Sequence, residues 1–375
     1  MNGDKLENIE QKLLFDGAPG AKIKISGIEY SYFGGTGYYE LNNNKEVIRF
    51  AVEELKKSGI TNSSSRSSYG TTQLLLDVEE EAAKFFGCED AVYLSSGFLT
   101  DIAAVISLSN TNKFDCIFID EISHYSNQYA AQVSGKPVYK YSHVDPDDLE
   151  KKISQYLKNG ERPLVLTDGV FPIFGRIAPL KDYLRIIEKY NGILWIDDAH
   201  GLGVLGKNGR GTTEYHRLKS EKVYFGGTLS KAFGGFGGII PGSKDFVEDI
   251  KNGQLQNGST PPPSSAAAAS LMGLKLLKAQ PEMRLKLWEN AKRLKSGLTQ
   301  IGFETNETVV PVYAFKLGGK SEMQRIKNEL MMNNIIIQFI NYIGTGDDGV
   351  LRIVVFSTHT FGQIDNLIYQ LKKII

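Results

Sequence analysis

The sequence is poor in cysteine, has no long apolar run and carries no excess of either charge. Its 375 residues include only Cys88 and Cys116, too few for a disulfide framework and without the spacing of metal ligands. No stretch approaches the roughly 18 apolar residues that mark a membrane helix, and residues 1–16 lack the apolar core of a secretion signal. Lysine plus arginine and aspartate plus glutamate each total 43, a balance that disfavours nucleic acid as a partner. These absences predict a cytoplasmic protein without a metal, a membrane span or a nucleic-acid partner.

Short apolar runs that alternate with amphipathic stretches predict an α/β fold. Five runs have the length and composition of buried strands: 91–94, 116–119, 163–166, 193–196 and 222–225. Helices are expected between them, one of them with Asp145 as N-cap and Pro146 in its first turn. Such alternation predicts a mostly parallel sheet, and ligands of these sheets bind beyond the carboxyl ends of the strands.

The last third of the chain has a different character. An alanine-rich helix is expected at 264–278, a charged helix at 282–298, strands at 309–316, 335–340 and 350–356, and a closing helix after 360. A chain of this length is expected to form two domains. We predict a large ligand-binding domain over 41–255 and a smaller α/β domain over 256–375, against which the N-terminal segment 1–40 packs.

Two carboxylates and a histidine follow the strand expected at 193–196. A buried aspartate is costly unless it meets a cation, and a protonated pyridine nitrogen is such a cation. Asp197 has the position of that partner, and His200 follows closely enough to reach an oxygen on the same ring. The alternative is that Asp197 or Asp198 caps a turn and that His200 is an ordinary loop residue.

Three glycines in the same segment imitate a dinucleotide-binding motif. Gly201, Gly203 and Gly206 have its spacing, but the motif needs a helix directly after it. Residues 207–211 predict a turn instead, which counts against a nicotinamide cofactor.

Lys231 follows the strand expected at 222–225 and lies between hydroxyl residues and glycines. A lysine forms an imine only as the neutral amine. A pocket that excludes water and has positive charge nearby lowers the pKa of the lysine and so favours this form. Thr228 and Ser230 offer hydroxyls to a phosphate. Such a lysine alone is more often a solvated surface charge. Together with the strand-end carboxylate, it is typical of an enzyme that carries pyridoxal 5′-phosphate (PLP) as an imine on Lys231.

Two further segments fit the same cofactor. The strand at 91–94 leads through a Ser-Gly turn to an expected helix start at Gly97 and Phe98, where free amides can bind a phosphate. His124 follows the strand at 116–119, and its ring could stack on the cofactor. The alternatives are an ordinary strand-to-helix turn and a packing histidine.

Two motifs of the chain resemble those of the α-oxoamine synthases: DDAHGLGVLGKNGRG at 197–211 and GTLSKAFGGFGG at 227–238. The resemblance runs from about Tyr32 to the C-terminus. It implies the aspartate-aminotransferase fold (PLP fold type I), in which a mostly parallel sheet of seven strands lies between helices and a smaller C-terminal α/β domain follows. It also implies cofactor roles. Lys231 would carry the imine, Asp197 would hold the pyridine nitrogen, His200 the ring's 3-oxygen and His124 the ring face, and the phosphate would be bound by Gly97, Phe98, Thr228 and Ser230.

The substrate side departs from the family pattern. Arg352 matches an arginine that binds the substrate carboxylate, a group that suits a guanidinium fork, although a strand-end salt bridge is the alternative. Thr36 stands where the family has an asparagine, Pro172 and Phe174 replace a serine and an aspartate, and Gln73 replaces a histidine. Arg66, in the serine-rich loop 62–68, is a further candidate substrate ligand. The cofactor residues are kept while those facing the substrate have changed.

The resemblance also implies a partner. Ser259 and Thr260 match a loop that reaches the phosphate of the neighbouring subunit, so a homodimer with shared active sites is expected. The prolines that follow at 261–263 could equally form a rigid turn between domains.

The implied activity is that of an acyltransferase. A small α-amino acid would condense with an acyl thioester, carried by coenzyme A or an acyl carrier protein, to an α-amino ketone, usually with loss of CO₂. Lys231 would serve as the general base. Transamination, carbon–carbon cleavage on the same scaffold and a binding subunit without activity are the alternatives. Ala232 and Phe233 follow the lysine, where an aminotransferase normally has an arginine, which counts against transamination.

Overall fold

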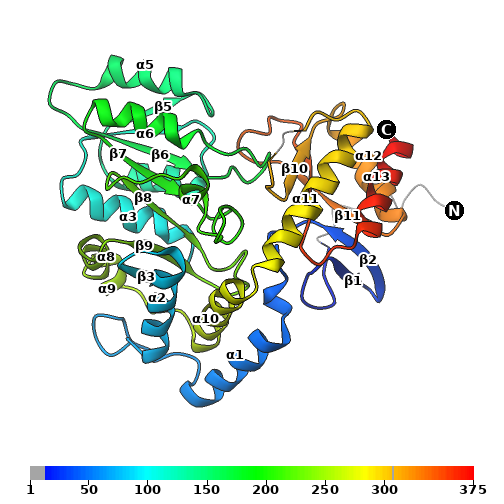
Figure 1. Cartoon of the computed structure of the whole chain (residues 1–375), viewed down its shortest axis with the longest axis horizontal. Helices are drawn as coiled ribbons and strands as arrows, with labels where there is room; N and C mark the ends of the chain where they lie inside the picture. The colour runs from blue at the N-terminus through cyan, green and yellow to red at the C-terminus, as the bar shows by residue number, and fades with distance from the viewer. Residues whose placement is uncertain (1–12, 306–307) are drawn as a thin grey trace.

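The computed structural model describes residues 13–305 and 308–375, which form two β-sheets with helices around each. In Figure 1 the larger sheet lies on the left and the smaller one on the right, and the long helix α11 (Glu282–Gln300) leads from one part to the other. The first twelve residues of the predicted N-terminal segment lie outside the described residues.

The larger sheet has seven strands, of which only one runs against the others. Its order is β3-β9-β8-β7-β6-β4-β5, and β9 (Gly238–Gly242) is antiparallel to both neighbours. The remaining strands are β3 (Asp90–Leu94), β4 (Cys116–Asp120), β5 (Val138–Tyr141), β6 (Pro163–Asp168), β7 (Ile193–Asp197) and β8 (Val223–Thr228). The predicted mostly parallel sheet is confirmed, and its strands extend to include the carboxylates Asp120, Asp168 and Asp197.

Alternate side chains of this sheet enter two separate cores. One face contributes Ile117, Leu166 and Trp195 and is covered by α3 (Phe98–Asn110), α4 (Tyr125–Val133) and α8 (Lys244–Lys251). The other face contributes Phe118 and Ile196 and is covered by α5 (Pro146–Tyr156) and α6 (Leu180–Lys189). Because both faces are covered, the strands are apolar throughout, which explains why they occur in the sequence as uniform runs.

The smaller sheet combines the two ends of the chain. Its order is β1-β2-β11-β12-β10, with β11 (Ile335–Ile340) parallel to β2 (Ile28–Phe33). The other strands are β1 (Lys22–Ile25), β10 (Val312–Phe315) and β12 (Val350–Val354), all in antiparallel pairs. The core of this sheet is shared with α11, α12 (Lys320–Met332) and α13 (Phe361–Ile374).

Local sequence signals explain where several helices begin. The Asp145 side chain accepts hydrogen bonds from the backbone of Asp147 and Asp148 at the start of α5, with Pro146 in the first turn, as predicted. Thr360 and Gln363 form a capping box at the start of α13. The short elements are η2 (Leu41–Asn43), α7 (Thr212–His216) and α9 (Gln254–Asn257).

Helix α10 (Ser264–Ala279) packs against α1 (Lys45–Ser58) and α2 (Gln73–Phe86), beside the larger sheet. The helices of the smaller sheet begin with α11. The predicted division of the chain near residue 255 stays a prediction, and the packing of α10 favours a boundary further along the chain.

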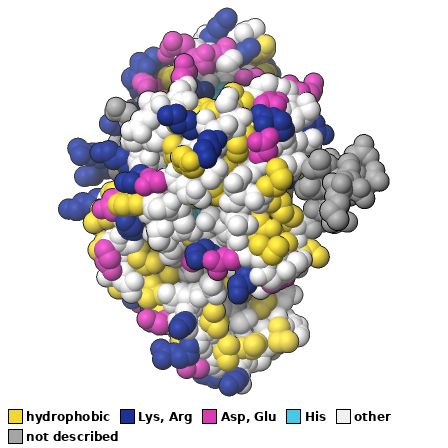
Figure 2. Space-filling view, turned by 90° about the vertical axis from the view of Figure 1, so that its right-hand side faces the viewer, with side chains coloured by type: hydrophobic (Ala, Val, Ile, Leu, Met, Phe, Trp, Pro, Cys, Tyr) yellow, Lys and Arg dark blue, Asp and Glu magenta, His cyan; other side chains and the backbone are white. Residues whose placement is uncertain are grey.

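Within the described ranges no helix is long and apolar enough to cross a bilayer, and no group of three or more His, Cys, Asp or Glu side chains could hold a metal. On the face shown in Figure 2, basic and acidic side chains are interspersed, with apolar patches between them.

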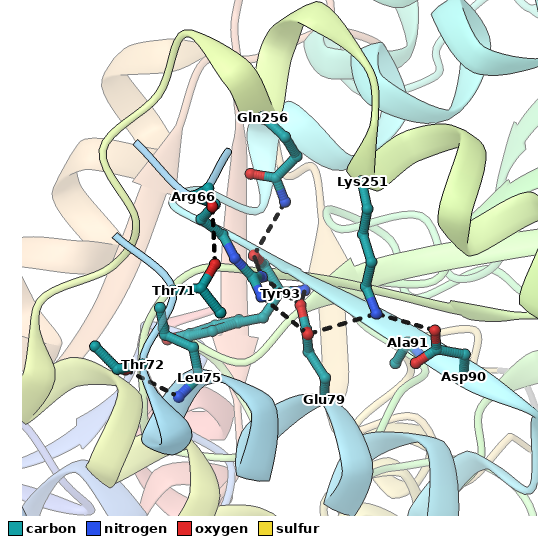
Figure 3. A network of polar contacts seen from close by, with 10 residues as sticks. All are labelled: Arg66, Thr71, Thr72, Leu75, Glu79, Asp90, Ala91, Tyr93, Lys251 and Gln256. Carbon is teal, nitrogen blue, oxygen red and sulfur yellow. Dashed lines mark hydrogen bonds and ion pairs between the residues drawn. The ribbon is translucent and has the colours of Figure 1, made fainter. Parts of the chain in front are cut away.

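A buried cluster of charges joins the loop before α2 to the edge of the larger sheet (Figure 3). Both terminal nitrogens of Arg66 bind the Glu79 carboxylate, which also accepts a hydrogen bond from the backbone of Tyr93 at 2.9 Å. The Lys251 ammonium lies 3.5 Å from Glu79 and 2.9 Å from Asp90. Glu79 therefore holds together the loop, α2, β3 and α8.

Replacing Glu79 by glutamine should destabilise the protein strongly, because the Arg66 guanidinium would stay buried without its countercharge. We expect E79Q to lower the free energy of unfolding by about 3 kcal/mol, measured by urea denaturation. The control is E80Q, since the neighbouring Glu80 binds Lys84 on the surface and should leave the midpoint nearly unchanged. Equal midpoints for the two variants would contradict this account of the cluster.

Candidate active site

The carboxyl ends of β6, β7 and β8 meet the first turns of α3 and α4 around a cavity of about 220 Å³. The loop after β6 and the turn after β8 complete its wall. The lining residues are Ser96, Gly97, Phe98, His124, Ser126, Asp168, Val170, Pro172, Asp197, Ala199, His200, Thr228, Ser230 and Lys231. All eight residues that the sequence assigned to the cofactor within one chain are among them.

Lys231 lies in the turn that leads from β8 to β9. Burial lowers the pKa of its amine to about 8, although the Asp197 carboxylate opposes this shift; the Arg352 guanidinium adds to it. About one Lys231 side chain in ten is therefore neutral at pH 7. The neutral amine is the form that attacks a carbonyl group and accepts a proton.

Asp197 is the last residue of β7 and is only 8% exposed. Its carboxylate accepts hydrogen bonds from the Ala199 backbone at 3.0 Å and from the Ser126 hydroxyl at 3.5 Å. No lysine or arginine in the described ranges forms an ion pair with it. Burial, together with the Asp197 carboxylate, raises the pKa of Asp101 and of Asp168 well above the usual range. A cation beside Asp197 would remove the cost of burying its charge.

Two histidines line the cavity from different elements. His200 is buried, and its Nδ1 lies 2.7 Å from the Tyr38 hydroxyl. His124 is the N-cap of α4, where its Nδ1 accepts a hydrogen bond from the Ser126 backbone. Burial lowers the pKa of both imidazoles, that of His200 well below its usual value. Both are therefore neutral at neutral pH.

The phosphate cradle predicted from the sequence has matching geometry. Gly97 is the N-cap of α3, so the first turn of this helix lies at the cavity wall, where the Phe98 amide donates to the Ser96 hydroxyl at 3.2 Å. A Cβ at Gly97 would lie 2.7 Å from the Cβ of Thr228, which explains why this position needs glycine. The hydroxyls of Thr228 and Ser230 are 2.7 Å apart. The lining residues 96–98, 228 and 230 bring backbone amides and hydroxyls together. None of these residues carries a carboxylate that would repel an anion.

Arg352 lies on β12 and is 4% exposed. Its Nε donates to the Pro172 carbonyl at 2.9 Å, and its Nη1 donates to the Gly35 carbonyl at 3.3 Å and to the Gln338 side chain at 3.0 Å. No carboxylate in the described ranges pairs with it, which removes the strand-end salt bridge as an explanation. Its Nη2 makes no hydrogen bond to a described residue. The guanidinium is thus fixed in orientation and keeps its charge for a ligand.

Five predicted site residues do not line this cavity. One is Arg352, which reaches the lining through the Pro172 carbonyl. The other four lie further from it. Arg66 is held by Glu79, and this ion pair gives it a structural partner. Thr36 lies beside Gly35, half-buried, and makes no hydrogen bond within the described ranges. Ser259 donates to the Leu255 carbonyl at 2.6 Å, and Thr260 follows it. The resemblance assigns the last two to a neighbouring subunit, and these four roles stay predictions.

Sequence analysis missed several residues that shape the site. Asp168 accepts hydrogen bonds from the His124 backbone at 3.0 Å and from Asn127 at 3.1 Å, so it fixes the start of α4. It follows a buried strand just as Asp197 does, a signal that was available. Gln338, a polar residue in an apolar run, binds both Arg352 and the Gly35 backbone. Tyr342, whose ring centroid is 6.2 Å from that of His124, comes from a loop without any such signal.

These features fit PLP. The cavity offers a lysine with a lowered pKa, a buried carboxylate without a cationic partner and a cradle for a phosphate. In a site for an apolar ligand, the Asp197 carboxylate would stay buried without a cation, which is unfavourable.

Comparison with known proteins identifies the class. A model of the aminotransferase class I and II family matches residues 35–371, so the chain belongs to this family, whose cofactor is PLP. Serine palmitoyltransferase from S. paucimobilis with bound PLP–myriocin has the same fold, with a TM-score of 0.91 at 24% identity over 99% of this chain and 95% of that chain.

Closer relatives define the group within this family. The chain is 32% identical over 358 residues to 8-amino-7-oxononanoate synthase of Thermosipho melanesiensis, covering 95% of this chain and 90% of that protein. The 8-amino-7-oxononanoate synthase of Francisella tularensis has a TM-score of 0.77 at 26% identity, over 91% of this chain and 96% of that chain. These relatives confirm the α-oxoamine synthase group, as the two glycine-rich motifs predicted.

The lowered pKa of Lys231 predicts an unusual pH profile for its reactivity. In protein freed of cofactor, the rate at which an amine-reactive reagent acylates Lys231 should rise about tenfold per pH unit and level off above pH 8. The exposed Lys84 serves as the internal control, because its hydrogen bond to Glu80 raises its pKa and its rate should still rise at pH 10. Peptide mass spectrometry measures both sites at once. A Lys231 profile that still rises beyond pH 9.5 would contradict a dry, neutral-amine site.

Proposed function

We propose that this protein is a PLP-dependent acyltransferase that condenses a small α-amino acid with an acyl thioester to an α-amino ketone, usually with decarboxylation. The observation that carries the proposal is the placement of Lys231 and Asp197 in one cavity, with a phosphate cradle on its wall. The match to 8-amino-7-oxononanoate synthases over nearly the whole chain supports the reaction class.

We assign the residues of the cavity separate roles in binding the cofactor. When bound, PLP withdraws electrons from the carbon at which bonds are made and broken. Asp197 would hold the ring nitrogen in its protonated form, and the amides of Gly97 and Phe98 with the hydroxyls of Thr228 and Ser230 would bind the phosphate. His124, at the start of α4, would cover the ring face.

Lys231 is proposed to hold the cofactor and then to move a proton. Its pKa of about 8 lies close to neutral pH, where a general base is most effective. Because the side chain lies in a turn between two strands of the rigid sheet, its nitrogen is held in place for proton transfer at the substrate's α-carbon.

Arg352 is proposed to bind the carboxylate of the amino acid. Hydrogen bonds to Pro172, Gly35 and Gln338 fix the plane of its guanidinium. Pro172 contributes a backbone carbonyl, so the loss of the family's serine at this position does not remove the support of the arginine.

We also propose that the protein is a homodimer with shared active sites, located in the cytoplasm. Exposed apolar side chains support the dimer: Phe98, Tyr125, Tyr129, Val133 and Phe236 are each between 38% and 52% exposed, and Phe98 also lines the cavity. Ser259 and Thr260, which lie away from the cavity of their own chain, would reach that of the partner. Both cysteines are free thiols, which suits a reducing compartment.

The dependence on a thioester tests the reaction class. The enzyme with bound PLP is incubated with each small α-amino acid, with and without acyl-coenzyme A or an acyl carrier protein thioester. Free thiol should appear only when both substrates are present, and K231A should release none. Keto-acid release without thioester would show transamination, and aldehyde release would show carbon–carbon cleavage. Either result would overturn the proposed acyl transfer.

Shortening the guanidinium fork tests the role of Arg352. R352K keeps the charge but loses the free Nη2 and the hydrogen bonds that fix the guanidinium plane, so the KM for the amino acid should rise about tenfold, and about a hundredfold in R352A. The KM for the thioester should change little. R293A is the matched control, since the exposed Arg293 binds Asp365 far from the cavity lining. An unchanged amino-acid KM in R352A with PLP bound would contradict the assignment.

A further inference from the structure

A buried hydrogen bond connects the N-terminal part of the chain to the histidine beside the cofactor cavity. The Tyr38 hydroxyl lies 2.7 Å from Nδ1 of His200, and the two rings meet at 62° with their centroids 6.3 Å apart. Tyr38 is 1% exposed and lines neither the cavity nor the surface. It touches the site only through His200.

The surroundings decide which partner donates. Burial raises the pKa of Tyr38 to about 12, so the phenol keeps its proton at every working pH. That proton has no acceptor in the described ranges other than Nδ1 of His200. A buried hydroxyl proton needs an acceptor, so Tyr38 donates and Nδ1 accepts.

The imidazole is then left with its single proton on the other nitrogen. The groups that face His200 in the described ranges are Lys231 from the turn after β8, Arg352 from β12, His124 from the start of α4, and Tyr38. Burial and the first three of these groups lower the pKa of His200 well below its usual value, which keeps the ring neutral. A neutral imidazole with an accepting Nδ1 carries its proton on Nε2. Nε2 makes no hydrogen bond to a described residue.

We propose that Tyr38 is a positioning residue that holds His200 in the Nε2–H tautomer, so that His200 presents a hydrogen-bond donor to the anionic ring oxygen of the cofactor. This inference rests on the proposed function, because it assigns the donor to a PLP-binding cavity. It goes beyond that function by giving a role to a tyrosine that contacts neither cofactor nor substrate.

The donor has a measurable consequence for the bound cofactor. A hydrogen bond to the ring oxygen favours its anionic form and weakens the hold of that oxygen on the proton shared with the Lys231 nitrogen. Loss of the donor should therefore raise the pH at which the visible absorption band of the bound cofactor changes. For one neutral hydrogen bond the expected rise is about half to one pH unit.

The test compares Y38F with the wild-type enzyme, both with bound PLP and without substrates. We expect the midpoint of the visible band to rise by about half to one unit in Y38F. In ¹⁵N-histidine protein, which has only five histidines, the wild-type His200 signals should show a proton on Nε2. In Y38F both nitrogens should move toward the average of the two tautomers.

The neighbouring Tyr39 supplies the matched control. It is as buried as Tyr38, and its hydroxyl donates to the Gly203 carbonyl at 2.7 Å. Y39F therefore loses a buried hydrogen bond of the same kind and should shift neither the band midpoint nor the His200 signals.

Two results would overturn the proposal. One is a wild-type His200 with its proton on Nδ1, a measurement that needs no variant and stands even if Y38F does not fold. The other is a Y38F enzyme that matches Y39F in both readouts. If wild-type protein forms no visible band with PLP, the proposed function fails instead, while the ¹⁵N signals of cofactor-free protein still decide the tautomer.

Discussion

The burial of Asp197 at the end of β7 is the constraint on which the rest of the site depends. A carboxylate without a cationic partner is costly inside a protein, and the described residues offer it only a backbone amide and the Ser126 hydroxyl. Burial, together with the Asp197 carboxylate, raises the pKa of two neighbouring carboxyls, Asp101 and Asp168, well above the usual range. A protonated pyridine nitrogen bound beside Asp197 would supply the cationic partner that the described residues do not.

Parallel strands bring the remaining groups to the same place. Because β6, β7 and β8 all end at one edge, Asp168, Asp197 and Thr228 lie side by side although they are far apart in sequence. The antiparallel β9 then returns the chain, so Lys231 lies in the connection 229–237, whose ends are fixed by two strands. Rigid elements hold each reactive atom, which reduces the cost of ordering the site when the cofactor binds.

The sequence predicted the fold, and the structure brings its eight candidate cofactor residues of one chain around one cavity, for physical reasons that differ between the two. Strands buried on both faces produce uniform apolar runs, and the chemistry of PLP needs a lysine, a carboxylate and glycines at strand ends, which a motif retains. The contacts of the residues outside the cofactor motifs could not be inferred from the sequence. Arg66 resembles a ligand because it is a lone arginine in a polar loop, yet its partner Glu79 lies on a helix whose register the loop does not reveal. The sequence did not single out Tyr38, because its hydrogen bond to His200 depends on how the segment after β2 packs against the loop after β7.

The pairing of β2 with β11 determines when this site can exist during synthesis. Ser31 pairs with Ile335, so the smaller sheet joins strands that are far apart in the sequence and cannot close until Ile335 has been synthesised. The larger sheet has all its strands by Gly242 and can form earlier. Gly35 and Tyr38 follow directly after β2, and Arg352 lies on β12. A nascent chain would therefore assemble the carboxyl ends of β6, β7 and β8 before Arg352 is added and before the sheet that precedes Tyr38 closes.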